Sequence, residues 1–298
     1  MTSIGRPPSL SHSSLWATQL IVAMALNGIT QAIQIGAYAA RYAGVQTHRI
    51  ATSISLFNLF VTASRLAALF LTPSLGALAD NATRPTVAAK LSAVPPDVIG
   101  TFDLQMRLIV AAGTIGTCVG AFLLPMFIYL FARGIRSFER KNSVLQAVVR
   151  LGDPRVMMDV LSSVRLPEIR TVLSYTREAI PPKLLIGNLV VMAIYAIGVP
   201  SAYYASVLNL DARTTAAGLS GIVNGIGTLA FTFFVDPTSA LMVDQAVKGE
   251  RSLNSIRAMV VGLTVTAICG TILSQLLLWP GAWAISHVAS LFVHGFRR

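Results

Sequence analysis

Long apolar segments separated by short polar ones dominate this chain. Six of them approach the length of about 20 residues that crosses a bilayer, at 15–40, 51–71, 108–132, 184–208, 214–235 and 258–279. The pattern predicts an all-α polytopic membrane bundle of six transmembrane helices. These fall into two three-helix halves, 1–132 and 184–298, which are joined by segment 133–183.

The second segment carries a polar row that a purely lipid-facing helix would lack. The row recurs at steps of three and four residues and is broken only by Leu69, so it lies on one helical face. Arg65 stands near mid-span, where a guanidinium costs at least ~2.5–3.5 kcal/mol unless it meets water, an anion or a partner group. We therefore expect a wet groove along this face, lined by Ser55, Asn58, Thr62, Arg65, Thr72 and Gly76.

The first segment has a similar row, made of Asn27, Gln31, Gln34, Tyr38 and Arg41. The fourth and fifth segments add Asn188 and Asn224.

Two alternative interpretations of these polar residues stay open. Amides often form hydrogen bonds between helices without lining a path, and Arg65 can form a buried ion pair with Asp80, Asp236 or Asp244. In the fifth segment, Gly221 and Gly225 have the small-residue spacing typical of close helix packing.

Segment 133–183 holds ten Lys and Arg residues. The positive-inside rule places it in the cytoplasm, with both chain termini outside. Apolar residues at helical spacing in 144–151 and 156–164 predict amphipathic helices on the inner membrane surface. Segment 281–296 is interpreted as a separate interfacial helix, and 81–107 as an outer connection without an assigned role.

An odd number of spans in each half implies that any internal repeat is inverted. An offset of 164 residues aligns Arg49 with Arg213, Phe70 with Phe234, Pro73 with Pro237 and Asp80 with Asp244. The aligned Arg, Pro and Asp residues fall at equivalent helix ends, so an inverted repeat is a hypothesis for the structure.

Composition agrees with a membrane protein, since 54% of the 298 residues are hydrophobic and 12% are charged, against about 25% charged in soluble domains. The net charge of +11 indicates contact with anionic membrane lipids and not with nucleic acid. The four histidines form no metal motif, and no phosphate-binding glycine loop is present. We therefore expect no enzyme, no metal and no cofactor.

Three stretches carry a resemblance: RIATSISLFNLFVTASRLAALFLTPSLGALAD (49–80), IGNLVVMAIYAIGVPSAYYA (186–205) and RTTAAGLSGIVNGIGTLAFTFFVDPTSALMVDQAVKGER (213–251). They resemble Amj, the "alternate to MurJ" family of bacterial lipid II flippases. The resemblance implies a plasma-membrane protein that moves undecaprenyl-diphosphate-linked disaccharide-pentapeptide (lipid II) from the inner to the outer leaflet.

A role for particular residues follows from that implied substrate. Arg65 would meet the diphosphate halfway across the membrane, because arginine binds phosphate oxygens bidentately. Arg41 and Arg49 would collect it at the inner end. Amides and hydroxyls would replace water around the sugars, and the candidate binding residues in the matching stretches also include Asn188, Asn224, Asp80, Asp236 and Asp244.

Three other functions compete with lipid II transport. A small-solute or ion-coupled transporter would have a polar site closed to lipid. A membrane enzyme acting on a polyprenyl phosphate would use Asp80, Asp236 and Asp244 as metal ligands. A scaffold without transport would explain the helices but not a mid-span arginine. Six helices are few for so large a head group, so a homodimer is a further hypothesis.

Overall fold

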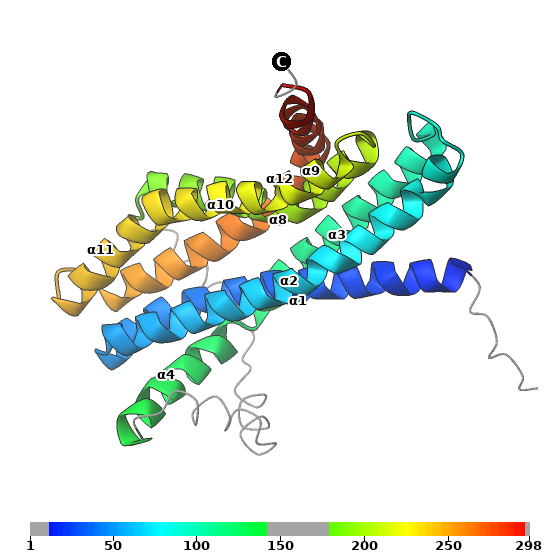
Figure 1. The fold of residues 1–298 in the computed structure, drawn as a ribbon. Coiled ribbons are helices and arrows are strands. Elements are labelled where there is room, and N and C mark those ends of the chain that lie inside the picture. Colours follow the sequence, from blue (N-terminus) through cyan, green and yellow to red (C-terminus); the bar gives the residue numbers. More distant parts are fainter. Residues whose placement is uncertain (1–11, 142–178, 296–298) are drawn as a thin grey trace, which may run out of the picture.

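A computed structural model describes residues 12–141 and 179–295 of the chain, and these residues form helices and no strand. The first half contains α1 (His12–Thr47), α2 (Ile50–Ala88), α3 (Pro96–Phe122) and α4 (Leu124–Lys141). The second half contains α8 (Pro182–Leu208), α9 (Arg213–Gly218), α10 (Ser220–Ala230), the π-helix η2 (Phe231–Val235), α11 (Asp236–Val247) and α12 (Leu253–His294). Figure 1 shows the helices as one elongated bundle.

Six helical spans in the described residues are long and apolar enough to cross a membrane, as the sequence predicted. α1 packs against α2 and α3, and α8 packs against the α9–α11 span and against α12. The two halves meet chiefly where α12 and α8 contact α3 and where α1 contacts α12. The α1–α2 turn, the α11–α12 turn and α4 all lie at one end of the bundle (Figure 1).

Glycines on the third helix of each half allow close approach to the first helix. A Cβ added at Gly116 of α3 would overlap the backbone of Gly28 of α1. In the second half, Gly270 of α12 lies against the backbone of Leu189 of α8. In each half a glycine thus supports the contact between the first and third helices.

The third span was predicted twelve residues too late and ends earlier than expected. It begins at Pro96, and α3 ends at Phe122. Pro125 cannot donate a backbone hydrogen bond and fits the first turn of a new helix, α4. The early start is possible because Arg107 Nε donates to Asp103 Oδ2 at 2.7 Å, so these two charges neutralise each other, and the third charge of the segment, Asp97, stands in the first turn of the helix.

α4 is an amphipathic helix and is not part of a span. Its Phe131, Ala132 and Ile135 pack against small residues of α1, while Arg133 and Arg136 are exposed. The amphipathic helices predicted at 144–151 and 156–164 lie outside the described residues.

Two further boundaries differ from the prediction. α2 continues through Pro73 and Pro85 to Ala88, so the connection to α3 is only 89–95 and not 81–107. α12 continues through Pro280 to His294, so the predicted separate helix at 281–296 is, as far as His294, the continuation of α12. The C-terminal part of α12, drawn in dark red, takes a different direction from its orange first part (Figure 1).

The span at 213–247 is interrupted twice. Leu219 separates α9 from α10, and the π-helical turn of η2 comes directly before Asp236 and Pro237. Pro237 has no N–H to continue the regular helical ladder, and π-turns and prolines are the usual causes of helix kinks. The predicted fifth span ended at Val235, whereas the helical path continues through the proline to Val247.

Candidate functional site

A cavity of about 810 Å³ lies between the two halves, and we call it the central cavity. Its walls come from α1 and α2 of the first half and from α8, α9, α10 and η2 of the second, with Asp236 at the start of α11. The polar side chains of the wall are Asn27, Thr30, Gln31, Gln34, Tyr38, Asn58, Thr62, Ser64, Arg65, Thr72, Tyr195, Ser220, Asn224, Thr228, Thr232 and Asp236.

The middle parts of the helical rows found in the sequence meet in this cavity, whereas Ser55, Gly76 and Arg41 at the ends of the rows are not in its lining. Asn27, Gln31 and Gln34 reach it from α1, because steps of three and four residues keep them on the face that α1 turns toward the second half. Asn58, Thr62 and Arg65 reach it from α2, again along one face. Asn224 and Asp236 complete it from the opposite wall.

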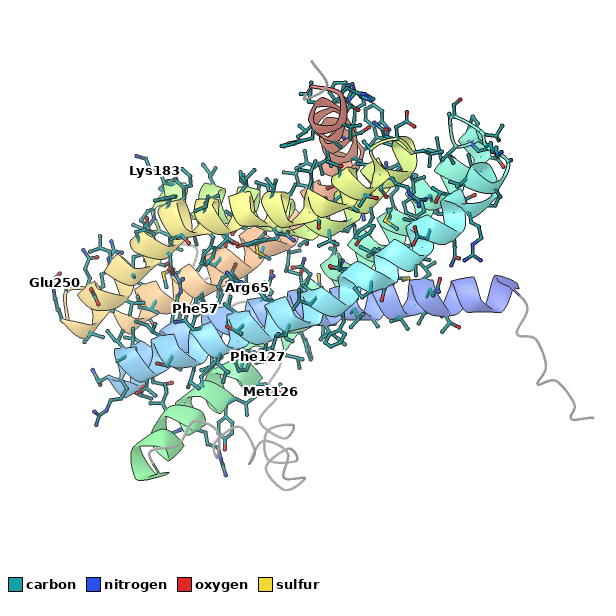
Figure 2. The ribbon with its side chains drawn as sticks, viewed as in Figure 1. Phe57, Arg65, Met126, Phe127, Lys183 and Glu250 are labelled. Carbon is teal, nitrogen blue, oxygen red and sulfur yellow. The ribbon has the colours of Figure 1, made fainter. Side chains whose placement is uncertain are left out.

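Arg65 is the cavity's cation without a protein partner. Its side chain is exposed in the cavity wall, and in the described part of the chain it forms neither a hydrogen bond nor an ion pair. The suggested ion pairs with Asp80, Asp236 and Asp244 are not formed. Figure 2 shows Arg65 on the side of α2 that faces the second half.

Two amides add unused hydrogen-bonding capacity. Gln31 Oε1 and Gln34 Oε1 are buried and meet no donor within the described residues. A buried polar atom without a partner is costly, so these oxygens are suited to accept hydrogen bonds from water or from ligand hydroxyls. Nearby, Tyr195 donates to Thr228 Oγ1 at 3.1 Å and links α8 to α10.

The cavity ends in an ion pair on the side of the α1–α2 turn. Arg41 Nη2 of α1 lies 2.6 Å from Asp236 Oδ1 of α11. The Arg41 guanidinium also lies 5.1 Å from the ring centre of Phe57 and 6.0 Å from that of Phe231. Phe57, Phe231 and Asp236 line the cavity and Arg41 contacts all three from behind, so side chains from α1, α2, η2 and α11 meet at this end.

The helices that flank the cavity are the least buried spans of the bundle. In both α2 and the 213–247 span, only 17% of the most apolar window is buried, against 39% or more in the other four. Leu69, which lines the cavity, is 65% exposed, and Phe233 of η2 is 70% exposed. Since exposed apolar side chains of a membrane bundle face lipid, the cavity lies beside two lipid-facing helices.

Besides Arg41, four of the candidate residues lie outside the lining of the cavity. Asn188 is fully buried behind the wall, where it accepts from Tyr38 Oη at 2.7 Å and donates to Leu263 O at 2.8 Å. Arg49 lies at the N-terminus of α2, and Asp80 and Asp244 are exposed outside the cavity. The described part of the chain holds no group of three His, Cys, Asp or Glu side chains suited to a metal ion.

Sequence reasoning did not identify Phe57 and Phe231 as part of the site. Their signal is weak, because a phenylalanine in an apolar span is ordinary. Only the position of Phe57, one residue before Asn58 at the edge of the polar face, could have suggested it.

The six spans and the polar, cation-bearing cavity between the halves define a multi-pass helical membrane protein with a transport-type cavity.

Comparison with known proteins identifies the family. The family model Amj, "Alternate to MurJ", matches residues 26–289. A relative from Bacillus subtilis (strain 168), named Lipid II flippase Amj, is 33% identical over 276 residues, which cover 92% of this chain and 98% of the relative. The chain belongs to the Amj family. No solved structure matches it.

Proposed function

We propose that this protein is a lipid II flippase of the bacterial plasma membrane, which moves the undecaprenyl-diphosphate-linked glycopeptide from the inner to the outer leaflet. One observation carries the proposal together with the family: an unpaired guanidinium lines a polar cavity flanked by lipid-facing helices.

The substrate makes three chemical demands on its carrier, because it joins an anionic diphosphate to a large polar head and a long apolar tail. Arg65 supplies a cation with several N–H donors in a fixed fork, which matches phosphate oxygens. Amides and hydroxyls at Gln31, Gln34, Asn58 and Thr62 offer hydrogen bonds to sugar hydroxyls. The tail stays in lipid beside the exposed apolar faces of α2 and α10.

The size of the cavity fits part of the head group. Pockets of roughly 300–1,000 Å³ enclose a drug-sized ligand, and the central cavity has about 810 Å³. We therefore place the diphosphate and the adjoining sugar inside it, while the peptide extends through the opening between α2 and α10. Leu69 and Arg65 both line the cavity and are both exposed, which argues against a small-solute site sealed from lipid.

Orientation follows from charge. We propose that the end carrying the α1–α2 turn, the α11–α12 turn and α4 faces the cytoplasm, because α4 begins the basic segment of the sequence at 133–183. Arg133 and Arg136 on the exposed face of α4 would contact anionic lipid head groups. The Arg41–Asp236 pair then closes the cytoplasmic end of the cavity.

Complementation tests the proposed function. Expression of this protein in a strain depleted of its own lipid II flippases is expected to restore growth and cell shape. A well-expressed, membrane-inserted protein that fails to restore growth would contradict the proposal and favour a small-solute transporter.

A further inference from the structure

The Arg41–Asp236 pair has features that a purely structural ion pair does not need. The Arg41 side chain is only 10% exposed. Its Nη1 is buried as well, yet this nitrogen meets no acceptor within the described residues. Only Nη2 is engaged by the carboxylate. A guanidinium fork that binds one oxygen retains a free donor for a second, and bidentate binding is what a phosphate or diphosphate group offers.

Asp236 contacts the Arg41 guanidinium from the side of the cavity. Its side chain is 48% exposed and lines the central cavity, whereas the 10% exposed Arg41 lies behind it. An anion within the cavity therefore reaches the guanidinium only when the Asp236 carboxylate moves aside. A single carboxylate carries one negative charge, whereas a diphosphate diester carries more charge and more acceptor oxygens. The diphosphate can therefore replace the carboxylate without leaving Arg41 as a buried, unpaired charge, which would be strongly destabilising.

The same side chain joins three walls of the cavity. Arg41 belongs to α1, while Phe57 of α2 and Phe231 of η2 lie against its guanidinium. Asp236 follows the π-turn of η2 and precedes Pro237, which is where the 213–247 span departs from regular helix geometry. A helix bends most readily at such a site, so release of Asp236 frees a locally deformable wall.

From this geometry we propose that Arg41 is a second diphosphate-binding position of the central cavity, occupied by Asp236 as an internal substitute for the substrate's anion. Lipid-linked diphosphate displaces the Asp236 carboxylate, and the displacement separates α11 from α1 and opens this end of the cavity. The proposal rests on the proposed function. In this proposal Arg41 recognises the diphosphate group and not the sugar, peptide or lipid tail.

Equilibrium binding of undecaprenyl diphosphate to purified protein in detergent tests the proposal, with undecaprenyl monophosphate as the comparison ligand. Asp236→Asn removes the competing charge and is expected to tighten diphosphate binding about tenfold, while Arg41→Ala weakens it by about tenfold or more. In the Arg41→Ala background, Asp236→Asn is expected to have no effect, because its target is gone.

A matched control is Asp103→Asn, which breaks the Arg107–Asp103 pair outside the cavity and is expected to leave the affinity unchanged. A folded Asp236→Asn protein with unchanged or weaker diphosphate binding would overturn the proposal. If Asp236→Asn does not fold, the Arg41→Lys variant tests the proposal instead, because a lysine lacks the bidentate fork of N–H donors. We expect it to weaken diphosphate binding about tenfold while monophosphate binding changes less, and an unchanged diphosphate affinity would overturn the proposal.

Binding and complementation by the wild-type protein distinguish failure of the proposed function from failure of the proposed role of Asp236. A wild-type protein that binds neither lipid and does not complement would contradict the proposed function itself. A wild-type protein that complements and binds diphosphate, with an affinity that Asp236→Asn does not increase, would contradict only the role of Asp236.

Discussion

Asn27 and Asn188 make the same interaction in the two halves of the molecule. Asn27 of α1 donates from Nδ2 to the backbone oxygen of Ile109 in α3 at 2.8 Å. Asn188 of α8 donates from Nδ2 to the backbone oxygen of Leu263 in α12, also at 2.8 Å. In each half an asparagine of the first helix thus fastens the third, although the two asparagines lie 161 residues apart and not at the 164-residue offset of the predicted repeat.

The two asparagines nevertheless differ in their relation to the cavity. Asn27 lines it, whereas Asn188 lies behind the wall and is saturated by Tyr38, Leu263 and Thr266. Tyr38 itself lines the cavity, so Asn188 holds a wall residue in place.

Asn188→Ala is therefore expected to lower stability, because it leaves buried hydrogen-bonding groups unpaired at about 1–3 kcal/mol each. Thermal unfolding in detergent measures this loss. Asn58→Ala, at an exposed position of the cavity wall, is expected to leave the unfolding temperature unchanged and to reduce transport severalfold. A stability loss in Asn58→Ala equal to that of Asn188→Ala would contradict this division of roles.

Two glycines of α3 test the close contact between α1 and α3. Gly116→Ala is expected to destabilise the protein by about 1–3 kcal/mol, the usual cost of overpacking, because the added methyl group overlaps the Gly28 backbone. Gly100 has no neighbour within 4 Å of the added Cβ, so Gly100→Ala is expected to be neutral or slightly stabilising. Melting curves of the two variants that coincide would argue against tight packing at Gly116.

The proposed orientation predicts which turns are accessible from outside the cell. In a Cys118→Ser, Cys269→Ser background, Ser92→Cys in the α2–α3 connection is expected to react with a membrane-impermeant maleimide in intact cells. Glu250→Cys in the α11–α12 turn is expected to react only after permeabilisation. The reverse pattern would place segment 133–183 outside and contradict the proposed direction of transport.

Much of the site could be predicted from periodicity, because residues three or four apart on a straight helix share a face whatever the neighbouring helices do. The rows through Arg65 and Gln31 reach one cavity for this reason. Residue type alone could not separate Asn188 from Asn27, since both amides stand on the same kind of apolar helix and differ only in what covers them.

The predictions that were wrong, such as the start of α3, have physical causes that the mean hydropathy of a sequence segment does not show. The start of α3 was missed because Asp103 and Arg107 reduce local hydropathy, although they neutralise each other four residues apart in the structure. Gly221 and Gly225 have the spacing of a close helix contact, but an added Cβ at either meets no atom within 4 Å, and both line the cavity. At these two positions the small residue leaves space for the cavity and does not bring two helices into contact.

The central claim is that the unpaired guanidinium of Arg65 binds the diphosphate as it crosses the membrane. The most direct measurement is the rate at which fluorescently labelled lipid II changes leaflet in proteoliposomes of wild-type protein, Arg65→Ala and Arg84→Ala, with Arg84 as an exposed arginine of the same helix outside the cavity. We expect Arg65→Ala to lose at least about 90% of the wild-type rate, as removal of a charge-assisted contact predicts, while Arg84→Ala stays at the wild-type rate. A folded Arg65→Ala protein that flips lipid II as fast as the wild type would contradict the claim.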